Sequence, residues 1–118
     1  MSTTTLNLLI NQNETFSQVV TLDPVINLTG YAGTCQIRQY PSPLSAVVAS
    51  PTITLDADPT LGKFTIAMTA AITRELPVSG TAHSDKTTYY YDVNMTSAAT
   101  VIRVLQGTVA VSPSVTRI

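Results

Sequence analysis

The chain has 118 residues, enough for one domain with a core of its own. Six Lys and Arg residues oppose seven Asp and Glu residues, giving a net charge of −1, so a nucleic-acid interface, which needs a basic surface, is not expected. Charged residues make up only 11% of the chain, so Thr, Ser, Asn and Gln must form most of the polar surface. Such a surface predicts poor solubility for an isolated monomer, so we expect part of it to be covered by something else.

A membrane protein and an exported protein are not expected either. No apolar run reaches the roughly 18 residues of a membrane helix. The segment Met1–Thr5 lacks the positive charge that begins a signal peptide. The single cysteine, Cys35, has no partner for an internal disulfide. We expect it to be buried as a small apolar residue rather than to act as a nucleophile.

Short strands are expected along the first half of the chain. Apolar and polar residues largely alternate in the ranges 6–10, 15–22, 33–40, 45–49 and 52–56. In the third range, Cys35 and Ile37 are expected to face the core. Gln36 and Arg38 are then expected to face outward. Pro51 separates the last two strands, which suits an edge strand or a change from one sheet to the other.

The only helix expected in the chain spans residues 69–76 and has one or two turns. Thr69 suits the N-cap position, and Pro77 ends the helix. Ile72 and Leu76 are four residues apart, so both are expected along one side of it. The neighbouring segments are a predicted strand at 63–69 and a predicted loop at 78–86.

Two β-rich runs near the C-terminus, joined by small residues, are typical of a hairpin. The residues of the first run that are expected to face the core are Tyr89, Tyr91, Val93 and Met95. Those expected to face outward are Thr88, Tyr90, Asp92, Asn94 and Thr96. Gly107 interrupts the second run, which predicts either a bulge or a close approach of another backbone segment.

Together these segments predict an all-β domain. Turn signals separate about seven to nine short strands, a pattern typical of an antiparallel β-sandwich, here with one short helical turn. We expect residues 1–118 to form this single domain, with a short arm at each end. The residues expected in its core include Phe64, Ile66, Tyr91 and Val93.

Residues of catalytic and metal-binding types occur, but their arrangement does not predict a reaction. His83, Ser84 and Asp85 are adjacent in a loop, where the base of a triad cannot lie between the other two groups. Asp56 and Asp58 have no further candidate ligands nearby for a metal. We therefore expect no catalytic residue, no metal and no cofactor.

The order of several short motifs resembles that of a known family. The motifs are Asn11–Phe16, Asn27–Tyr31, Gln36–Arg38, Gly62–Thr69, Tyr91–Val93, Arg103–Val109 and Val111–Arg117. Their order, over nearly the whole chain, is similar to that in immunoglobulin-like β-sandwich domains of tailed bacteriophages, such as the N-terminal domain of baseplate upper proteins and small tail-fibre-associated proteins. The resemblance implies an immunoglobulin-like sandwich with no catalytic residues to carry over.

The resemblance also implies a function. It implies a non-enzymatic structural virion protein, made in the host bacterial cytoplasm, that acts as an adaptor in the tail, baseplate or fibre-attachment region. Its partners are then other virion proteins, and it is present in many copies or as a homo-oligomer. One alternative is a capsid decoration protein bound to the major capsid protein. An alternative of another class is a carbohydrate- or receptor-binding module that uses Tyr90 and the loop at 78–86.

The two ends of the chain are the expected contacts with neighbouring proteins. Apart from one arginine they carry no charge, and the sequence suggests no partner for them within the domain. Their β-forming residues suit addition to an exposed sheet edge. The expected contact residues are Thr3, Thr4, Thr5, Val115, Thr116 and Arg117, together with Tyr90 of the hairpin.

Removing residues 113–118 is therefore expected to lower the incorporation of the protein into its assembly, because the arm supplies main-chain hydrogen bonds to a neighbour. The measurement is the occupancy of the truncated protein in purified particles. Occupancy equal to that of the full chain would mean that contact comes from the faces of the sandwich.

Overall fold

The computed structural model describes residues 4–42, 44–80, 82 and 84–114. Its strands are β1 (Thr4–Thr5), β2 (Leu8–Asn11), β3 (Phe16–Thr21), β4 (Ala32–Arg38), β5 (Val47–Ala49), β6 (Thr52–Leu55), β7 (Lys63–Met68), β8 (Thr87–Thr96) and β9 (Val101–Ser112). The helical elements within the described ranges are the 3-10 helix η1 (Pro59–Leu61) and the α-helix α1 (Ala70–Arg74). Neither of these is long or apolar enough to cross a membrane.

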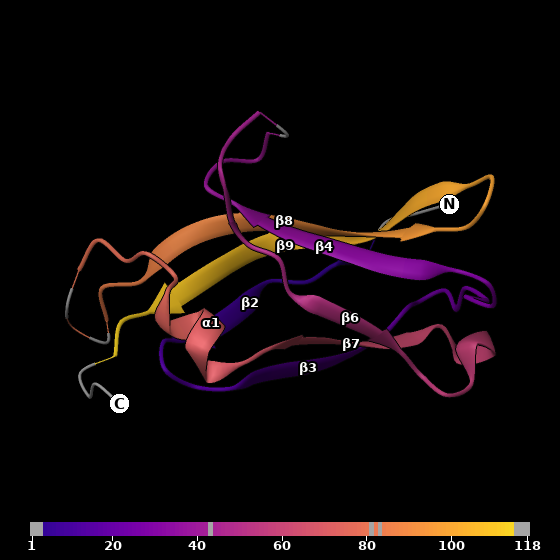
Figure 1. Ribbon diagram of the computed structural model, residues 1–118, viewed down its shortest axis with the longest axis horizontal. Coiled ribbons are helices and arrows are strands. Elements are labelled where there is room, and N and C mark those ends of the chain that lie inside the picture. Colours follow the sequence, from indigo (N-terminus) through magenta and orange to yellow (C-terminus); the bar gives the residue numbers. More distant parts are fainter. Residues whose placement is uncertain (1–3, 43, 81, 83, 115–118) are drawn as a thin grey trace.

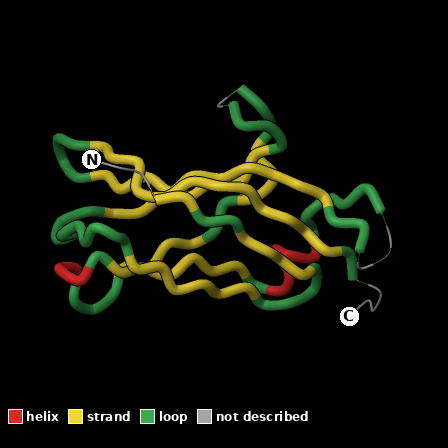
Figure 2. The backbone as a smooth tube through the Cα atoms, turned by 180° about the vertical axis from the view of Figure 1, so that it is seen from behind, coloured by secondary structure: helices red, strands yellow, loops and turns green. Residues whose placement is uncertain are grey.

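The strands form two stacked sheets, which Figure 1 shows as an upper and a lower layer. The larger sheet has six strands: β1 and β2 both pair with β9, and β8, β4 and β5 follow in that order. The smaller sheet has three strands in the order β3, β7, β6. Figure 2 shows the same two layers from behind, with α1 and η1 at opposite ends of the smaller sheet. The predicted all-β sandwich with one short α-helix is confirmed.

One part of the larger sheet corrects the predicted antiparallel arrangement. β1 and β2 run parallel to β9. The other pairs of described strands are antiparallel. β1 and β2 pair with the last strand of the chain rather than with their sequence neighbour β3, so no hairpin turn sets an antiparallel direction for them.

Two features give the sandwich its immunoglobulin-like character. β5 extends the sheet of β4, β8 and β9, and β3, β7 and β6 form the opposite sheet, as in a variable-type immunoglobulin domain. Near the start of β8, the hydroxyl of Tyr89 donates a hydrogen bond to the carbonyl oxygen of Pro77. Like the tyrosine corner of immunoglobulin domains, this contact ties the start of the strand to the connection before it.

The hydrophobic core lies between the inward faces of the two sheets. The four predicted core residues are each at most 5% exposed: Phe64, Ile66, Tyr91 and Val93. The inward and outward sets predicted for β4 and β8 are confirmed as well, because burial alternates along both strands. Cys35 is buried in the same cluster, as expected. Period-two alternation therefore identified the faces of these strands correctly.

The chain changes sheets at Pro51, one of the two outcomes that the sequence predicted. β5 pairs with β4 in the larger sheet, and β6 pairs with β7 in the smaller sheet. Pro51 lies between them and is buried. Because proline has no N–H group to donate to a ladder, it interrupts the strand where the chain crosses from one layer to the other.

Gly107 permits a close backbone approach, as predicted. A Cβ atom at this position would lie 2.1 Å from the carbonyl oxygen of Leu6. The amide of Leu6 donates to the carbonyl oxygen of Gln106 at 2.9 Å, and the hydroxyl of Tyr91 donates to the carbonyl oxygen of Leu6 at 2.6 Å. The chain is thus held at Leu6, between β1 and β2. The strand predicted at 6–10 is β2, which begins at Leu8. The register shift of β9 lies elsewhere, opposite Val93.

The helix α1 is present with its predicted cap, and the structure shows which of its side chains are buried. The hydroxyl oxygen of Thr69 accepts a hydrogen bond from the amide of Ile72 at 3.3 Å. Leu76 is buried, whereas Ile72 is 38% exposed. Thr73 is buried instead, and its hydroxyl donates to the carbonyl oxygen of Glu14 at 2.9 Å. The contact with the turn before β3 decides which side of this short helix faces inward.

Replacing Phe64 with Ala is expected to lower the free energy of unfolding by about 3–5 kcal/mol. The ring is buried in the core, and its removal leaves a cavity. Denaturant unfolding followed by circular dichroism measures this loss. Thr65→Ala, on the outward side of the same strand, is the control and should change the free energy by less than about 0.5 kcal/mol. A loss below about 1 kcal/mol for Phe64→Ala would contradict the assigned strand faces.

Candidate functional site

Outward side chains of the larger sheet form a continuous polar surface. The strand register sets them in rows: Arg38 lies opposite Tyr90, and Tyr90 lies opposite Thr108. In the next row Gln36, Asp92 and Gln106 are neighbours. We call this surface the polar face; it comprises Asn7, Gln36, Arg38, Tyr90, Asp92, Asn94, Arg103, Gln106 and Thr108.

The polar face is the floor of a hollow of about 670 Å³, a size suited to a ligand or to part of a partner. Figures 1 and 2 show that the β4–β5 loop stands out from the larger sheet, on the side away from the smaller sheet. Tyr40, Pro41 and Ser42 of this loop line one wall of the hollow. Leu44 at the tip is 94% exposed, and Tyr40 is 59% exposed. A polar floor therefore lies beside an apolar, protruding loop.

Hydrogen bonds hold this loop to the polar face. The hydroxyl oxygen of Ser45 lies 2.8 Å from the carbonyl oxygens of both Tyr40 and Ser42, which share its single donor hydrogen. The guanidinium of Arg38 donates through Nη1 to the carbonyl oxygen of Ser45 at 2.6 Å. Because Arg38 is itself a residue of β4, the base of the loop is fixed to the sheet.

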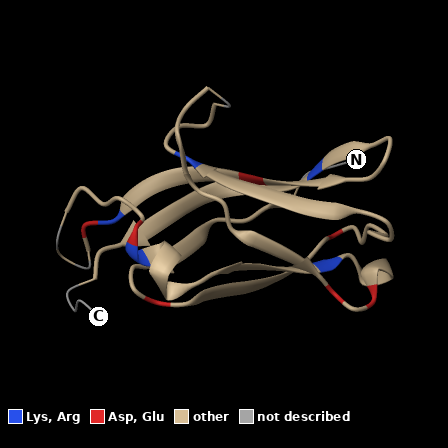
Figure 3. Ribbon diagram, viewed as in Figure 1, with Lys and Arg blue, Asp and Glu red and all other residues tan. Residues whose placement is uncertain are grey.

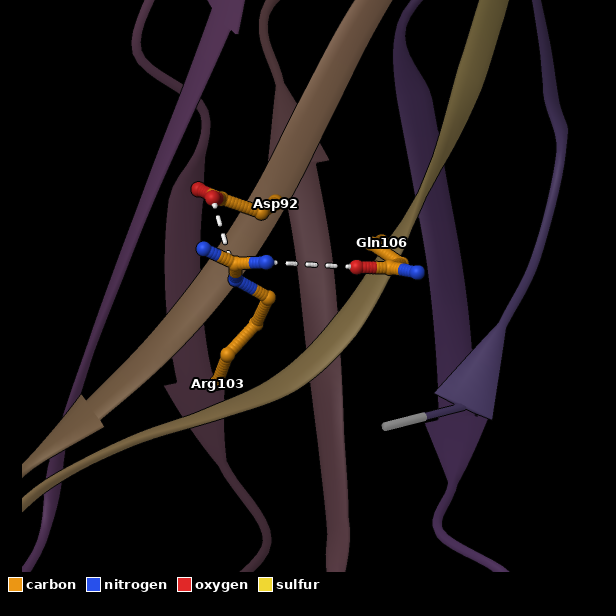
Figure 4. A network of polar contacts seen from close by, with 3 residues as sticks. All are labelled: Asp92, Arg103 and Gln106. Carbon is orange, nitrogen blue, oxygen red and sulfur yellow. Dashed lines mark hydrogen bonds and ion pairs between the residues drawn. The ribbon is translucent and has the colours of Figure 1, made fainter. Parts of the chain in front are cut away.

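A small charge network crosses the centre of the polar face, and Figure 4 shows its three residues. The Nε atom of Arg103 lies 3.5 Å from Oδ2 of Asp92, and its Nη1 donates to Oε1 of Gln106 at 3.4 Å. Both charged side chains are open to solvent, so the ion pair contributes at most about 1 kcal/mol. Figure 3 shows how few other charged residues lie on the two sheets. The network orients its side chains more than it stabilises the fold.

Two of the predicted contact residues, Thr5 and Tyr90, line the same hollow. Thr4 of β1 pairs with Leu105 of β9 and is not among the residues that line the hollow. The expectation that the N-terminal segment lacks a partner within the domain is wrong, because β1 pairs with β9 in the same chain. The contact role of these threonines stays a prediction.

The C-terminal contact residues Thr116, Val115 and Arg117, like Thr3, lie outside the described residues. Immediately before them, Pro113 is buried and the amide of Ser114 donates to Oε1 of Gln12 at 3.0 Å. The domain therefore extends to Ser114, and a truncation that tests the arm alone should remove only residues 115–118.

The alternation along the strands predicted that four residues face outward, but it did not predict that they lie together. These residues are Gln36, Arg38, Asp92 and Asn94. Alternation gives the side of a strand on which a residue lies, but not which strands are neighbours in the sheet. The pairing of β8 with both β4 and β9 brings the four residues together, and no short motif in the sequence encodes that pairing.

The loop carboxylates that were considered as metal ligands accept hydrogen bonds from nearby backbone amides. The side chain of Asp58 accepts hydrogen bonds from the hydroxyl and the amide of Thr60, and these bonds lower the pKa of its carboxyl group. Asp56 accepts from the amide of Asp58 at 3.1 Å. Ser84 and Asp85 are exposed, and Asp85 accepts from the amide of Ala82 at 3.2 Å. His83 lies outside the described residues. Among the described residues, no three His, Cys, Asp or Glu side chains gather as metal ligands would.

Comparison with known proteins shows distant likenesses in structure. No family model and no curated protein matches the chain. The structure of the NK cell receptor Nkp44, described as a triggering partner in natural cytotoxicity, is 17% identical, with 95% of this chain and 100% of that chain covered and a TM-score of 0.41. The extracellular fragment of novel immune-type receptor 10 from Ictalurus punctatus is 11% identical, with 92% and 96% covered and a TM-score of 0.36.

These comparisons overturn the resemblance to tailed-bacteriophage domains that the sequence motifs suggested. The two structures described above are those of immune-type receptors, and no matching family model supports a phage domain. The quoted motifs consist of turn residues and alternating strands, which any immunoglobulin-like sandwich needs, so their order follows from the fold rather than from a phage origin. At these TM-scores the two likenesses carry no conclusion about the function of this chain.

Alkaline pH is expected to destabilise the domain through Cys35. Burial, and secondarily the charge of Asp92, raises the pKa of its thiol from 9.0 to about 12. The folded state therefore holds the proton more tightly than the unfolded state, so this stabilisation is complete below pH 9.0 and is lost as the pH rises toward about 12. Burial raises the pKa of Tyr91 in the same direction.

Urea unfolding at a series of pH values above about 8 measures this effect. The free energy of unfolding should fall with pH, and it should fall less steeply in Cys35→Ala. Equal slopes in the two proteins would contradict the assignment to Cys35. A thiol reagent should label Cys35 only after denaturant is added.

Proposed function

We propose that this protein is a non-enzymatic structural subunit that binds a protein partner through the polar face and the β4–β5 loop, and that it works as one of many copies in an assembly. The exposure of Leu44 at the loop tip, 94%, carries the proposal. A leucine held in water beside a polar hollow gains free energy when a partner covers it.

The chemistry of the surface suits a protein partner. Buried apolar or aromatic anchors surrounded by polar groups are the usual arrangement at the centre of a protein interface. Here Leu44 and Tyr40 supply the anchors, and the polar face supplies hydrogen-bonding groups next to them. Ser45 and Arg38 fix the base of the loop, which lowers the entropy lost when a partner binds.

A virus particle is one assembly in which such a subunit would function, in the tail, baseplate, fibre region or capsid. The small size of the domain and its 11% of charged residues support a subunit that is covered in its working state. Immunogold labelling of particles tests this location independently of the binding surface.

Photo-crosslinking tests the binding surface directly. p-Benzoylphenylalanine at position 44 or 40 should form adducts with one partner when the protein is expressed in its own source and irradiated, because both side chains are exposed on the loop and Tyr40 lines the hollow. The same probe at Val19 is the matched control, since Val19 is exposed on the outward side of the opposite sheet. Mass spectrometry identifies the adducts.

Leu44→Asp should abolish the adduct formed from position 40, because a carboxylate cannot replace the apolar anchor. Adducts that form equally well from position 19, or that survive Leu44→Asp, would place the binding surface elsewhere.

A glycan-binding role is a second candidate, favoured by the position of Tyr90 between Arg38 and Thr108, where a ring lies beside hydrogen-bonding groups. A glycan array with the wild-type protein and Tyr90→Ala tests it. Specific binding that Tyr90→Ala removes would support this role over a protein partner.

A further inference from the structure

Three side-chain amides on the polar face each accept a hydrogen bond through their oxygen atom. Oε1 of Gln36 accepts from Nη2 of Arg38 at 2.7 Å. Oε1 of Gln106 accepts from Nη1 of Arg103 at 3.4 Å. Oδ1 of Asn7 accepts from the backbone amide of Thr108 at 3.1 Å. Each partner is a group that can only donate, so the chemistry forces the orientation of all three amides.

This orientation leaves the amino groups of the three amides directed toward other partners. Each NH₂ group carries two donor hydrogens. No described residue accepts a hydrogen bond from the NH₂ group of Asn7, Gln36 or Gln106. Arg38 has five N–H donors, of which the bonds to Ser45 and Gln36 use two. The three amides and Arg38 thus present several donor hydrogens at the polar face.

The balance of charge on the polar face points the same way. Its charged residues are Arg38, Arg103 and Asp92, two positive and one negative, although the whole chain has a net charge of −1. The single carboxylate lies against Arg103. A ligand that matches this face therefore carries acceptor oxygens and negative charge.

We propose that the polar face binds an acidic segment of a partner protein. Its carboxylates accept hydrogen bonds from the amino groups of Asn7, Gln36 and Gln106 and from Arg38, and an apolar residue of the same segment contacts Leu44 and Tyr40. The inference rests on the proposed function, whose partner it specifies. The 94% exposed Leu44 favours a peptide over an acidic glycan, because a sugar has few apolar groups to cover it.

Nuclear magnetic resonance tests the inference with a synthetic probe, hexaglutamate, added to the whole chain labelled with nitrogen-15. The side-chain NH₂ resonances of Asn7, Gln36 and Gln106 should shift on titration and return as salt is added, since the contacts are exposed and screened. Gln12 and Gln18 are internal controls, because their amino groups already donate to the carbonyl oxygens of Leu76 and Val19. Hexaglutamine is the control peptide and should cause no shift.

Variants of the same size that introduce a negative charge sharpen the test. Gln36→Glu and Gln106→Glu keep an acceptor for the neighbouring arginine but replace the NH₂ donor with a carboxylate oxygen. Each should weaken hexaglutamate binding by about threefold to fivefold. Gln18→Glu adds the same charge on the smaller sheet and should leave binding unchanged.

The outcomes separate this inference from the proposed function. No shift with hexaglutamate, together with a crosslink from position 44, would overturn the acidic partner and leave the docking surface standing. Shifts with a sulfated or sialylated oligosaccharide and none with the peptide would overturn the choice of a protein segment. If Gln18→Glu weakens the shifts as much as Gln36→Glu and Gln106→Glu do, hexaglutamate is attracted to the whole chain. That result would overturn the site.

Discussion

The structure depends on the two faces of β8. This strand lies in the larger sheet with β4 on one side and β9 on the other, so its inward residues enter the centre of the core and its outward residues form the middle of the polar face. A shift of one residue in its register would exchange the two sets, burying Asp92 and exposing Val93. The core and the candidate site are therefore fixed by the same alternation.

The second constraint is the attachment of the N-terminal segment at Leu6. Gly107 leaves room for the carbonyl oxygen of Leu6, and the hydroxyl of Tyr91 donates to that oxygen. This contact sets β1 and β2 along β9 and places Asn7 at the side of the polar face. An inward-facing tyrosine thus helps to complete a site on the outward face of the same sheet.

The few charged residues of this chain have a specific role in the folded domain that the composition does not reveal. Among the described residues, three charged side chains line the hollow, and the hydrogen bonds of two of them orient neighbouring amides. An amide whose oxygen is held by an arginine becomes a directed donor without carrying a charge itself. The face can therefore select an acidic partner even though the chain as a whole is slightly acidic.

The sequence by itself determined the local structure. Alternation identified the faces of β4, β7 and β8, Thr69 marked the start of α1, and Pro51 marked the change of sheet, because each of these features depends on residues close together in the chain. It did not determine the parallel pairing of β1 and β2 or the burial of Thr73, and the resemblance that it suggested was wrong.

Only the tertiary structure decided the candidate site. Gln36, Asp92 and Gln106 are far apart in the sequence and become neighbours through the pairing of β4, β8 and β9. Likewise, the amide orientations follow from which donor lies beside each side chain. Strand neighbours are chosen by the packing of the whole domain rather than by residues near them in the chain, so no local pattern in this sequence specifies them.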